Sequence, residues 1–130
     1  MSNKMSVLVS SGDREQLQMA AMISSVAAVS GNEVNIFLSM NSLRYFQQGD
    51  TNVAPSEGEV GALLQNKSVP DFRELFRSAV ELGDAQIYPC SMALDILNIP
   101  ASGLLDYITP EPLGLTRFLD MSSDSQVLSF

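Results

Sequence analysis

The chain contains no histidine, and its 130 residues include a single cysteine, Cys90. Without histidine there is no Ser-His-Asp or Cys-His pair, no imidazole acid–base group and no histidine-ligated metal. Zinc is not typically held by one cysteine and carboxylates alone, so we expect no metal and no other cofactor. One cysteine cannot form an internal disulfide, which indicates a reducing compartment and predicts a cytoplasmic protein.

Basic residues are also scarce, with 7 Lys and Arg against 15 Asp and Glu, which gives a formal net charge of −8. An acidic surface opposes binding to phosphate backbones and anionic lipids, so we expect no nucleic-acid partner and no membrane partner. We expect no signal peptide, because the opening residues are followed by a strand pattern and not by the apolar region that a signal peptide has. The apolar run over 19–29 is interrupted by Ser24 and Ser25 and is too short to span a membrane.

The apolar residues, 45% of the chain, suffice for the core of a single domain over 1–130. Apolar segments of strand length alternate with helical patterns, which predicts an α/β fold: three layers, a mostly parallel sheet of about five strands, and helices on both faces. Residues 49–69 form a long connection, expected to be a flexible loop with one helical turn. We expect strands over 5–9, 34–40, 85–88, 103–108 and 126–130, and helices over 14–30, 43–48, 68–83, 91–98 and 109–121.

Two of these helices carry further signals. Asp13 and Gln16 have the spacing of a capping box at the start of the first helix. This helix has one stripe of mainly small residues suited to packing on the sheet, and a second stripe of larger apolar residues, which predicts a homo-oligomer. The clearest helix, ending near Gly83, repeats apolar residues at helical spacing. Its stripe is Phe72, Leu75, Phe76, Ala79 and Val80; the first helix has Leu17, Ala20, Ala21, Ser24, Ala27 and Ala28 on one side and Met19, Met22, Ile23, Val26 and Val29 on the other.

The expected strand ends indicate where a functional site would lie, because ligands gather at the carboxyl edge of a parallel sheet. Cys90 falls at such an end and at the start of a helix, whose free N–H groups would stabilise a thiolate. Buried free cysteines are nevertheless common, so the residues alone leave a reactive and a structural Cys90 equally open. The other expected pocket-lining residues are Ser11, Gly12, Asp13, Asn41 and Ser91.

The segment after Cys90 has the pattern Cys-x-Met-x-x-Asp, with Met92 and Asp95, followed by two apolar residues. Together with Gly12-Asp13 and the segment over 31–34, this resembles the DsrE/DsrF-like sulfur-relay family over most of the chain apart from the middle loop. The resemblance implies a small α/β domain, often trimeric or hexameric, whose cysteine carries sulfane sulfur as a persulfide between donor and acceptor proteins. By position Cys90 would be the sulfur acceptor, and we assign packing and helix-positioning roles to Met92 and Asp95.

Three functions follow as hypotheses. The preferred one is a sulfur carrier, sulfurtransferase-like if active; with no second cysteine, transfer must end on another molecule. The alternatives are a non-catalytic regulatory or assembly protein with a structural Cys90, and a peroxide-sensing thiol that forms sulfenic acid. Nucleotide binding has the weakest support, because the segment over 10–13 matches no phosphate-binding glycine motif.

Overall fold

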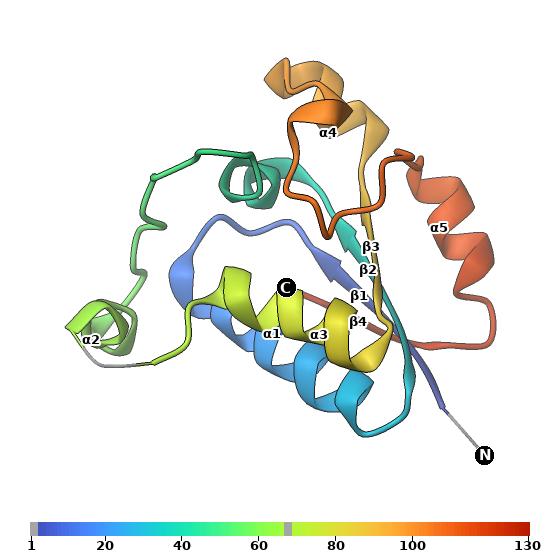
Figure 1. The fold of residues 1–130 in the computed structure, drawn as a ribbon, viewed down its shortest axis with the longest axis horizontal. Coiled ribbons are helices and arrows are strands. Elements are labelled where there is room, and N and C mark those ends of the chain that lie inside the picture. The colour runs from blue at the N-terminus through green and yellow to red at the C-terminus, as the bar shows by residue number, and fades with distance from the viewer. Residues whose placement is uncertain (1–2, 67–68) are drawn as a thin grey trace.

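The computed structural model describes residues 3–66 and 69–130 and shows an α/β fold with an all-parallel four-stranded sheet, ordered β3-β2-β1-β4 (Figure 1). Parallel neighbours need crossover connections, and helices supply them between β1 and β2 and between β2 and β3. The strands are β1 (Lys4–Val9), β2 (Glu33–Leu38), β3 (Gln86–Pro89) and β4 (Gln126–Ser129). The helices are α1 (Arg14–Val29), α2 (Glu59–Asn66), α3 (Phe72–Gly83), α4 (Ser91–Leu97) and α5 (Leu115–Met121), with 3₁₀ turns η1 (Met40–Tyr45) and η2 (Ala101–Gly103).

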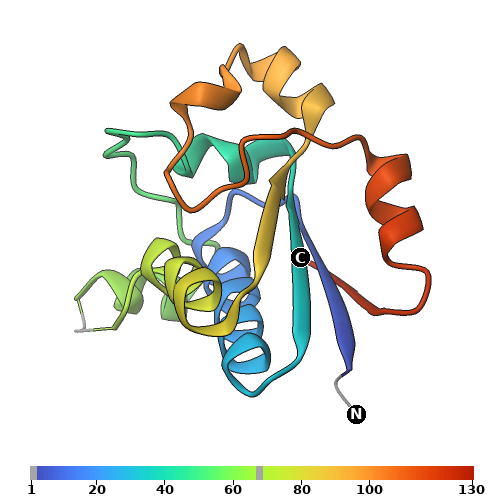
Figure 2. The ribbon, with the colours of Figure 1, turned by 45° about the vertical axis from the view of Figure 1, so that its right-hand side comes forward.

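The predicted three layers are confirmed. Helices α1 and α3 cover one face of the sheet and α5 covers the other, while α4 lies beyond the carboxyl ends of the strands (Figures 1 and 2). The small-residue stripe of α1 is buried, apart from the partly buried Ala27, as is the core of the α3 stripe. On the opposite face, Phe118 of α5 stacks on Phe37 of β2 with 4.9 Å between ring centroids.

The expected fifth strand, over 103–108, is absent from the described residues, and the prediction of about five strands is corrected to four. Leu104 makes only an isolated antiparallel bridge to Gln47 of the middle segment, and the chain then turns. The chain reaches the outer edge of β3 only further on, where the N–H groups of Thr109 and Leu113 donate to the carbonyls of Ile87 and Pro89 (both about 3 Å). Pro110 and Pro112 lie between these bonds, and proline has no N–H to continue a ladder.

Several helix boundaries also differ from the sequence predictions. The capping box of α1 does not form: the Asp13 carboxylate makes no cap hydrogen bond, and the Asp13 N–H donates to Ser11 Oγ at 3.0 Å. Helix α3 is capped by Asp71, whose carboxylate accepts from the Arg73 N–H at 3.1 Å; the expected opening at Ser68 lies outside the described residues. Helix α5 begins after Gly114 rather than at Thr109, because the prolines keep the preceding chain extended.

The middle segment is attached to α1 through Arg14. This buried side chain donates to the carbonyls of Gly61 (3.0 Å) and Ala54, and its backbone N–H donates to the carbonyl of Pro55 (2.9 Å). Glu15 completes the attachment by accepting from the Gly61 N–H at 2.9 Å. The segment also contains α2, which is longer than the single turn expected. Residues 54–61 are therefore held against the start of α1, whereas the flexibility expected for 49–69 stays a prediction.

None of the helices described is both long and apolar enough to cross a membrane.

Candidate functional site

Cys90 lies at the carboxyl edge of the sheet, immediately after β3, as its place in the sequence predicts. Its backbone N–H donates to the carbonyl of Leu38 at the end of β2 (2.9 Å), and its own carbonyl accepts from the Leu94 N–H in α4 (3.0 Å). The next residue, Ser91, donates its N–H to the carbonyl of Leu113 (2.9 Å). Bonds to β2, to α4 and to the segment before α5 therefore fix the backbone around the thiol.

The Cys90 side chain is 4% exposed, but it lines a cavity of about 240 Å³. Cys90 is therefore nearly buried, but it borders a cavity. Cys90 is the N-cap residue of α4, yet Sγ makes no hydrogen bond to the first turn, so the amide contact expected from the sequence is missing. We call this cavity the cysteine pocket; its walls are Leu8, Val9, Ser10, Phe37, Ser39, Met40, Met92, Leu115 and Ser129.

The rim of the cysteine pocket is apolar. Met40, Met92 and Leu115 are each about half exposed, and they come from η1, α4 and α5. Met40 has φ of 52°, a left-handed conformation that side chains rarely adopt. The sequence indicates Met92 through its motif and places Met40 at the end of the second strand, but neither Met40 nor Leu115 is among the predicted site residues. No local signal marks Leu115, because α5 reaches the pocket only through tertiary packing.

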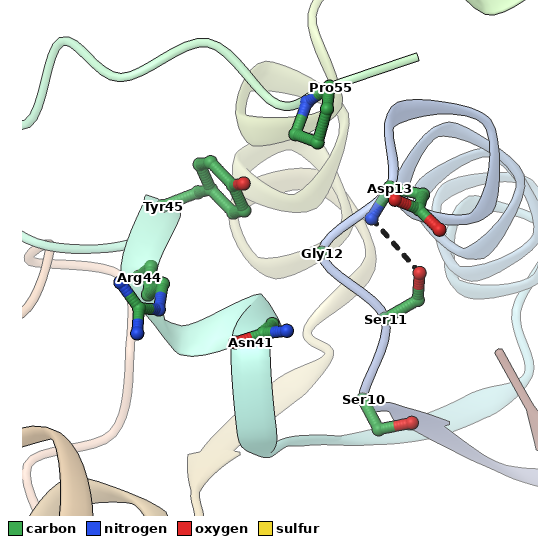
Figure 3. A pocket seen from close by; sticks show the side chains of 8 residues that line it. All are labelled: Ser10, Ser11, Gly12, Asp13, Asn41, Arg44, Tyr45 and Pro55. Carbon is green, nitrogen blue, oxygen red and sulfur yellow. Dashed lines mark hydrogen bonds between the residues drawn. The ribbon is translucent and has the colours of Figure 1, made fainter. Parts of the chain in front are cut away.

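The polar residues predicted to lie beside Cys90 gather in a second cavity instead. Ser11, Gly12, Asp13 and Asn41 share a cavity of about 430 Å³ (Figure 3), and among the described residues only Ser10 lines both cavities. We call it the polar pocket; its remaining walls are Arg44, Tyr45 and Pro55. Ser91 and the exposed Asp95 line neither cavity.

Gly12 allows two walls of the polar pocket to approach each other closely. A Cβ atom at this position would lie 2.9 Å from the Cβ of Asn41 and 3.6 Å from the Tyr45 hydroxyl, closer than ordinary contact in the first case. The loop after β1 therefore lies directly against η1. Asn41 and Tyr45 project from η1 toward this loop, and the Tyr45 ring extends toward Gly12 and Pro55 (Figure 3).

Arg73 of α3 holds Tyr45 in place. Its Nε donates to the Tyr45 carbonyl at 2.6 Å, and its guanidinium lies 5.7 Å from the centre of the Tyr45 ring. The same group pairs with Asp50 at 3.1 Å, which ties the start of the middle segment to the site. The Tyr107 hydroxyl donates to the Arg73 carbonyl at 3.1 Å, and because burial raises the pKa of Tyr107, this hydroxyl stays protonated.

Comparison with known proteins is consistent with this architecture. The YchN protein from E. coli has a crystal structure similar to this one, with a TM-score of 0.70 and 16% sequence identity over 100% of both chains. At that identity the likeness shows the fold alone. No curated protein sequence matches the chain significantly. A family match extends over residues 3–130, from before β1 to the last residue, and confirms the resemblance seen around Cys90. The chain therefore belongs to the DsrE/DsrF-like family.

Proposed function

We propose that this protein is a sulfur carrier that holds sulfane sulfur as a persulfide on Cys90. Membership of a family whose proteins generally relay sulfur supports the proposal. The observation that carries it is the cysteine pocket: the only thiol of the chain lines a cavity at the carboxyl edge of the sheet, where α/β proteins bind ligands.

The chemistry is an exchange at a sulfane sulfur. The Cys90 thiolate attacks the outer sulfur of a donor persulfide, RS–SH, so that a new S–S bond forms at Cys90 as the donor S–S bond breaks. The electron pair leaves on the donor as RS⁻, and Cys90 is left as a persulfide. An acceptor thiolate then attacks the outer sulfur in the same way and returns Cys90 to the thiolate. No net oxidant is needed.

The shape of the pocket suits this cargo. Its apolar walls and the low exposure of Cys90 would shield a bound persulfide from bulk water. The exposed methionines Met40 and Met92 on the rim are flexible and polarizable, and they would adapt to a partner's sulfur-bearing segment. Donor and acceptor proteins are accordingly the proposed partners, and a reducing cytoplasm is the proposed setting.

A specific observation favours one alternative, a regulatory or assembly protein with a structural cysteine. Cys90 is nearly buried, and its sulfur makes no hydrogen bond to the first turn of α4. Helix-end stabilisation of a thiolate therefore lacks its most direct contact in this structure. The two functions differ in one measurable property, which is whether the thiol exchanges with a persulfide.

We expect the native protein to gain the mass of one sulfur atom when it is incubated with a persulfide or polysulfide donor. Intact mass spectrometry under non-reducing conditions measures the gain, and a reductant should reverse it. The Cys90→Ser variant should gain nothing, because the chain has no other cysteine. A native protein that stays unmodified, while a free thiol in the same tube is loaded, would establish the structural role. Treatment with peroxide followed by dimedone trapping tests the sensor hypothesis, because dimedone traps the sulfenic acid that such a thiol would form.

We further propose that the protein is a homo-oligomer, a trimer or hexamer, assembled through the larger apolar stripe of α1. Met19, Met22, Val26 and Val29 are all about half exposed or more, although they are apolar. Met19, Met22 and Val26 line a groove of about 430 Å³ together with Met5 of β1. Apolar surface of this extent on one helix face is typical of an interface.

We expect Val26→Asp to shift the protein to the monomer, because a carboxylate at an apolar interface would lose its hydration without gaining a partner. Light scattering coupled to size-exclusion chromatography at micromolar concentration measures the mass. Val60→Asp is the matched control, since Val60 of α2 is 62% exposed and Val26 is 67% exposed. A native protein that elutes as a monomer would rule out the assembly.

A further inference from the structure

The cysteine pocket is much larger than the single sulfur atom that a persulfide adds to Cys90. Its volume is about 240 Å³. One water molecule, which is similar in size to a sulfur atom, takes about 30 Å³ of liquid. The outer sulfur of a persulfide would therefore leave most of the pocket unfilled, and the space suffices for several sulfur atoms in a row.

The pocket also extends across the sheet. Its walls include residues at the carboxyl ends of all four strands: Ser10 after β1, Ser39 after β2, Cys90 after β3 and Ser129 at the end of β4. Because the strand order is β3-β2-β1-β4, Cys90 and Ser129 belong to opposite edges of the sheet. Neighbouring strands are about 4.8 Å apart, so the two outer strands are separated by about 14 Å. An S–S bond is about 2.05 Å long, so only a chain of several sulfur atoms would follow the pocket away from Cys90.

The lining of the pocket suits divalent sulfur better than it suits water. Apart from Cys90 and three serines, its walls are apolar, and they include the buried side chains of Val9 and Phe37. The Ser10 hydroxyl already donates to the carbonyl of Phe130 at 3.3 Å. An ordered water molecule needs two to four polar partners. A chain of sulfane sulfur atoms resembles a thioether instead: it is polarizable and accepts hydrogen bonds only weakly.

We propose that the cysteine pocket stores several sulfane sulfur atoms as a polysulfide chain on Cys90. The inference rests on the proposed function and goes beyond it, because a relay needs to hold only one sulfur atom at a time. The chain extends from Cys90 along the carboxyl ends of β2 and β1 toward Ser129, which are the walls of the pocket. The protein is then a reservoir that takes sulfur from several donor molecules before it delivers any.

The chain grows by the same exchange that loads the first sulfur. The persulfide anion Cys90–S–S⁻ attacks the outer sulfur of a second donor, RS–SH, so that Cys90–S–S–SH forms and the electron pair leaves as RS⁻. The donor's proton stays on the transferred sulfur, and no oxidant is consumed. In delivery, an acceptor thiolate attacks the outermost sulfur, takes it as its own persulfide, and leaves the chain on Cys90 one atom shorter.

The test uses cysteine persulfide as the donor, because each molecule of it brings one sulfane sulfur. The donor is added in large excess and then removed, and the intact mass of the protein is measured under non-reducing conditions. We expect native molecules that have gained two or more sulfur atoms, whereas Cys90→Ser should gain none. The same protein unfolded in urea is the comparison, since it has the same thiol without the pocket. We expect the unfolded protein to lose the species with more than one added sulfur.

Variants that narrow the pocket test where the chain lies. Ser39 is half-buried, lines the pocket and makes no cap hydrogen bond to η1. We expect Ser39→Leu to gain the first sulfur but to lose the species with two or more. Ser91→Leu is the matched control, because Ser91 is also half-buried and adjoins Cys90 but does not line the pocket. If Ser39→Leu does not fold, Ser129→Phe and its control Gln126→Phe repeat the test, since both residues are exposed on β4 and only Ser129 lines the pocket.

Three outcomes would overturn the inference: the native protein gains one sulfur and no more, the unfolded protein holds chains of the same length, or the narrowed pocket holds as many sulfur atoms as the native one. Each of these leaves the sulfur-carrier proposal intact, because the first sulfur is still accepted. A native protein that gains no sulfur at all would contradict the carrier itself, and the stored chain with it.

Discussion

Replacing Phe118 by alanine is expected to destabilise the protein by about 3–5 kcal/mol, the cost typical of removing a fully buried phenylalanine. Phe118 has no exposed surface, stacks on Phe37 and meets the edge of Tyr88 at 6.4 Å between ring centroids. It is the one buried residue of α5, a helix of 7 residues that is too short to be stable without packing. Urea unfolding followed by circular dichroism measures the change.

The same substitution should open the cysteine pocket, because Leu115 of α5 forms part of its wall. We expect Cys90 to be alkylated faster in Phe118→Ala than in the native protein under conditions where both are folded. Leu119→Ala is the control, since Leu119 belongs to the same helix but is about half exposed. If Phe118→Ala is destabilised but its Cys90 alkylation rate is unchanged, α5 does not limit access to the thiol. If the alanine variant does not fold, Phe118→Leu provides a milder substitution for the same test.

Much of the architecture could be predicted because the relevant signals are local. The apolar stripe of α3 and the two stripes of α1 are periodic patterns. In the structure the α3 stripe and the small-residue stripe of α1 face the core, and the larger stripe of α1 lies on its exposed side. The position of Cys90 at a strand end also follows from local features, because a short apolar strand runs directly into a helix. Such patterns are set by backbone geometry within one element and do not depend on distant residues.

The errors arise where distant segments decide the structure. Residues 103–108 have an apolar composition suited to a strand, but Tyr107 and Ile108 are buried without pairing to a strand, and the Tyr107 hydroxyl donates to the Arg73 carbonyl of α3. The prolines at 110 and 112 prevent a ladder further along the chain. The capping box fails for a more local reason: the Asp13 N–H, from which the Gln16 side chain would accept in a capping box, donates to Ser11 Oγ instead.

The predicted site shows the same limit. The sequence placed Ser11, Gly12, Asp13 and Asn41 together by topology, and the structure does bring them together, in the polar pocket. Their separation from Cys90 could not be foreseen, because the division of the carboxyl edge into two cavities, both lined by Ser10, depends on tertiary packing.

Gly83 provides the second large expected effect, and for a reason that the sequence did not indicate. As the last residue of α3 it was interpreted as the glycine that ends the helix, but the left-handed residue is Asp84, with φ of 58°. Gly83 is needed instead for close packing of α3 on α1. A Cβ atom here would lie 2.5 Å from the Cβ of Ala28 and 2.6 Å from its backbone carbonyl carbon.

We therefore expect Gly83→Ala to lower the free energy of unfolding by at least about 1–3 kcal/mol, the range for forcing extra volume into a packed contact. Urea unfolding measures it. Gly114→Ala is the matched control, because no atom lies within 4 Å of the Cβ position there and φ is −83°. Adding Ala28→Gly to Gly83→Ala should restore only part of the loss, since the backbone of residue 28 also blocks the new methyl group. If Gly83→Ala and Gly114→Ala had the same free energy of unfolding, α1 and α3 would have to separate easily. The larger apolar stripe of α1 would then lack the rigid support that an interface between subunits requires.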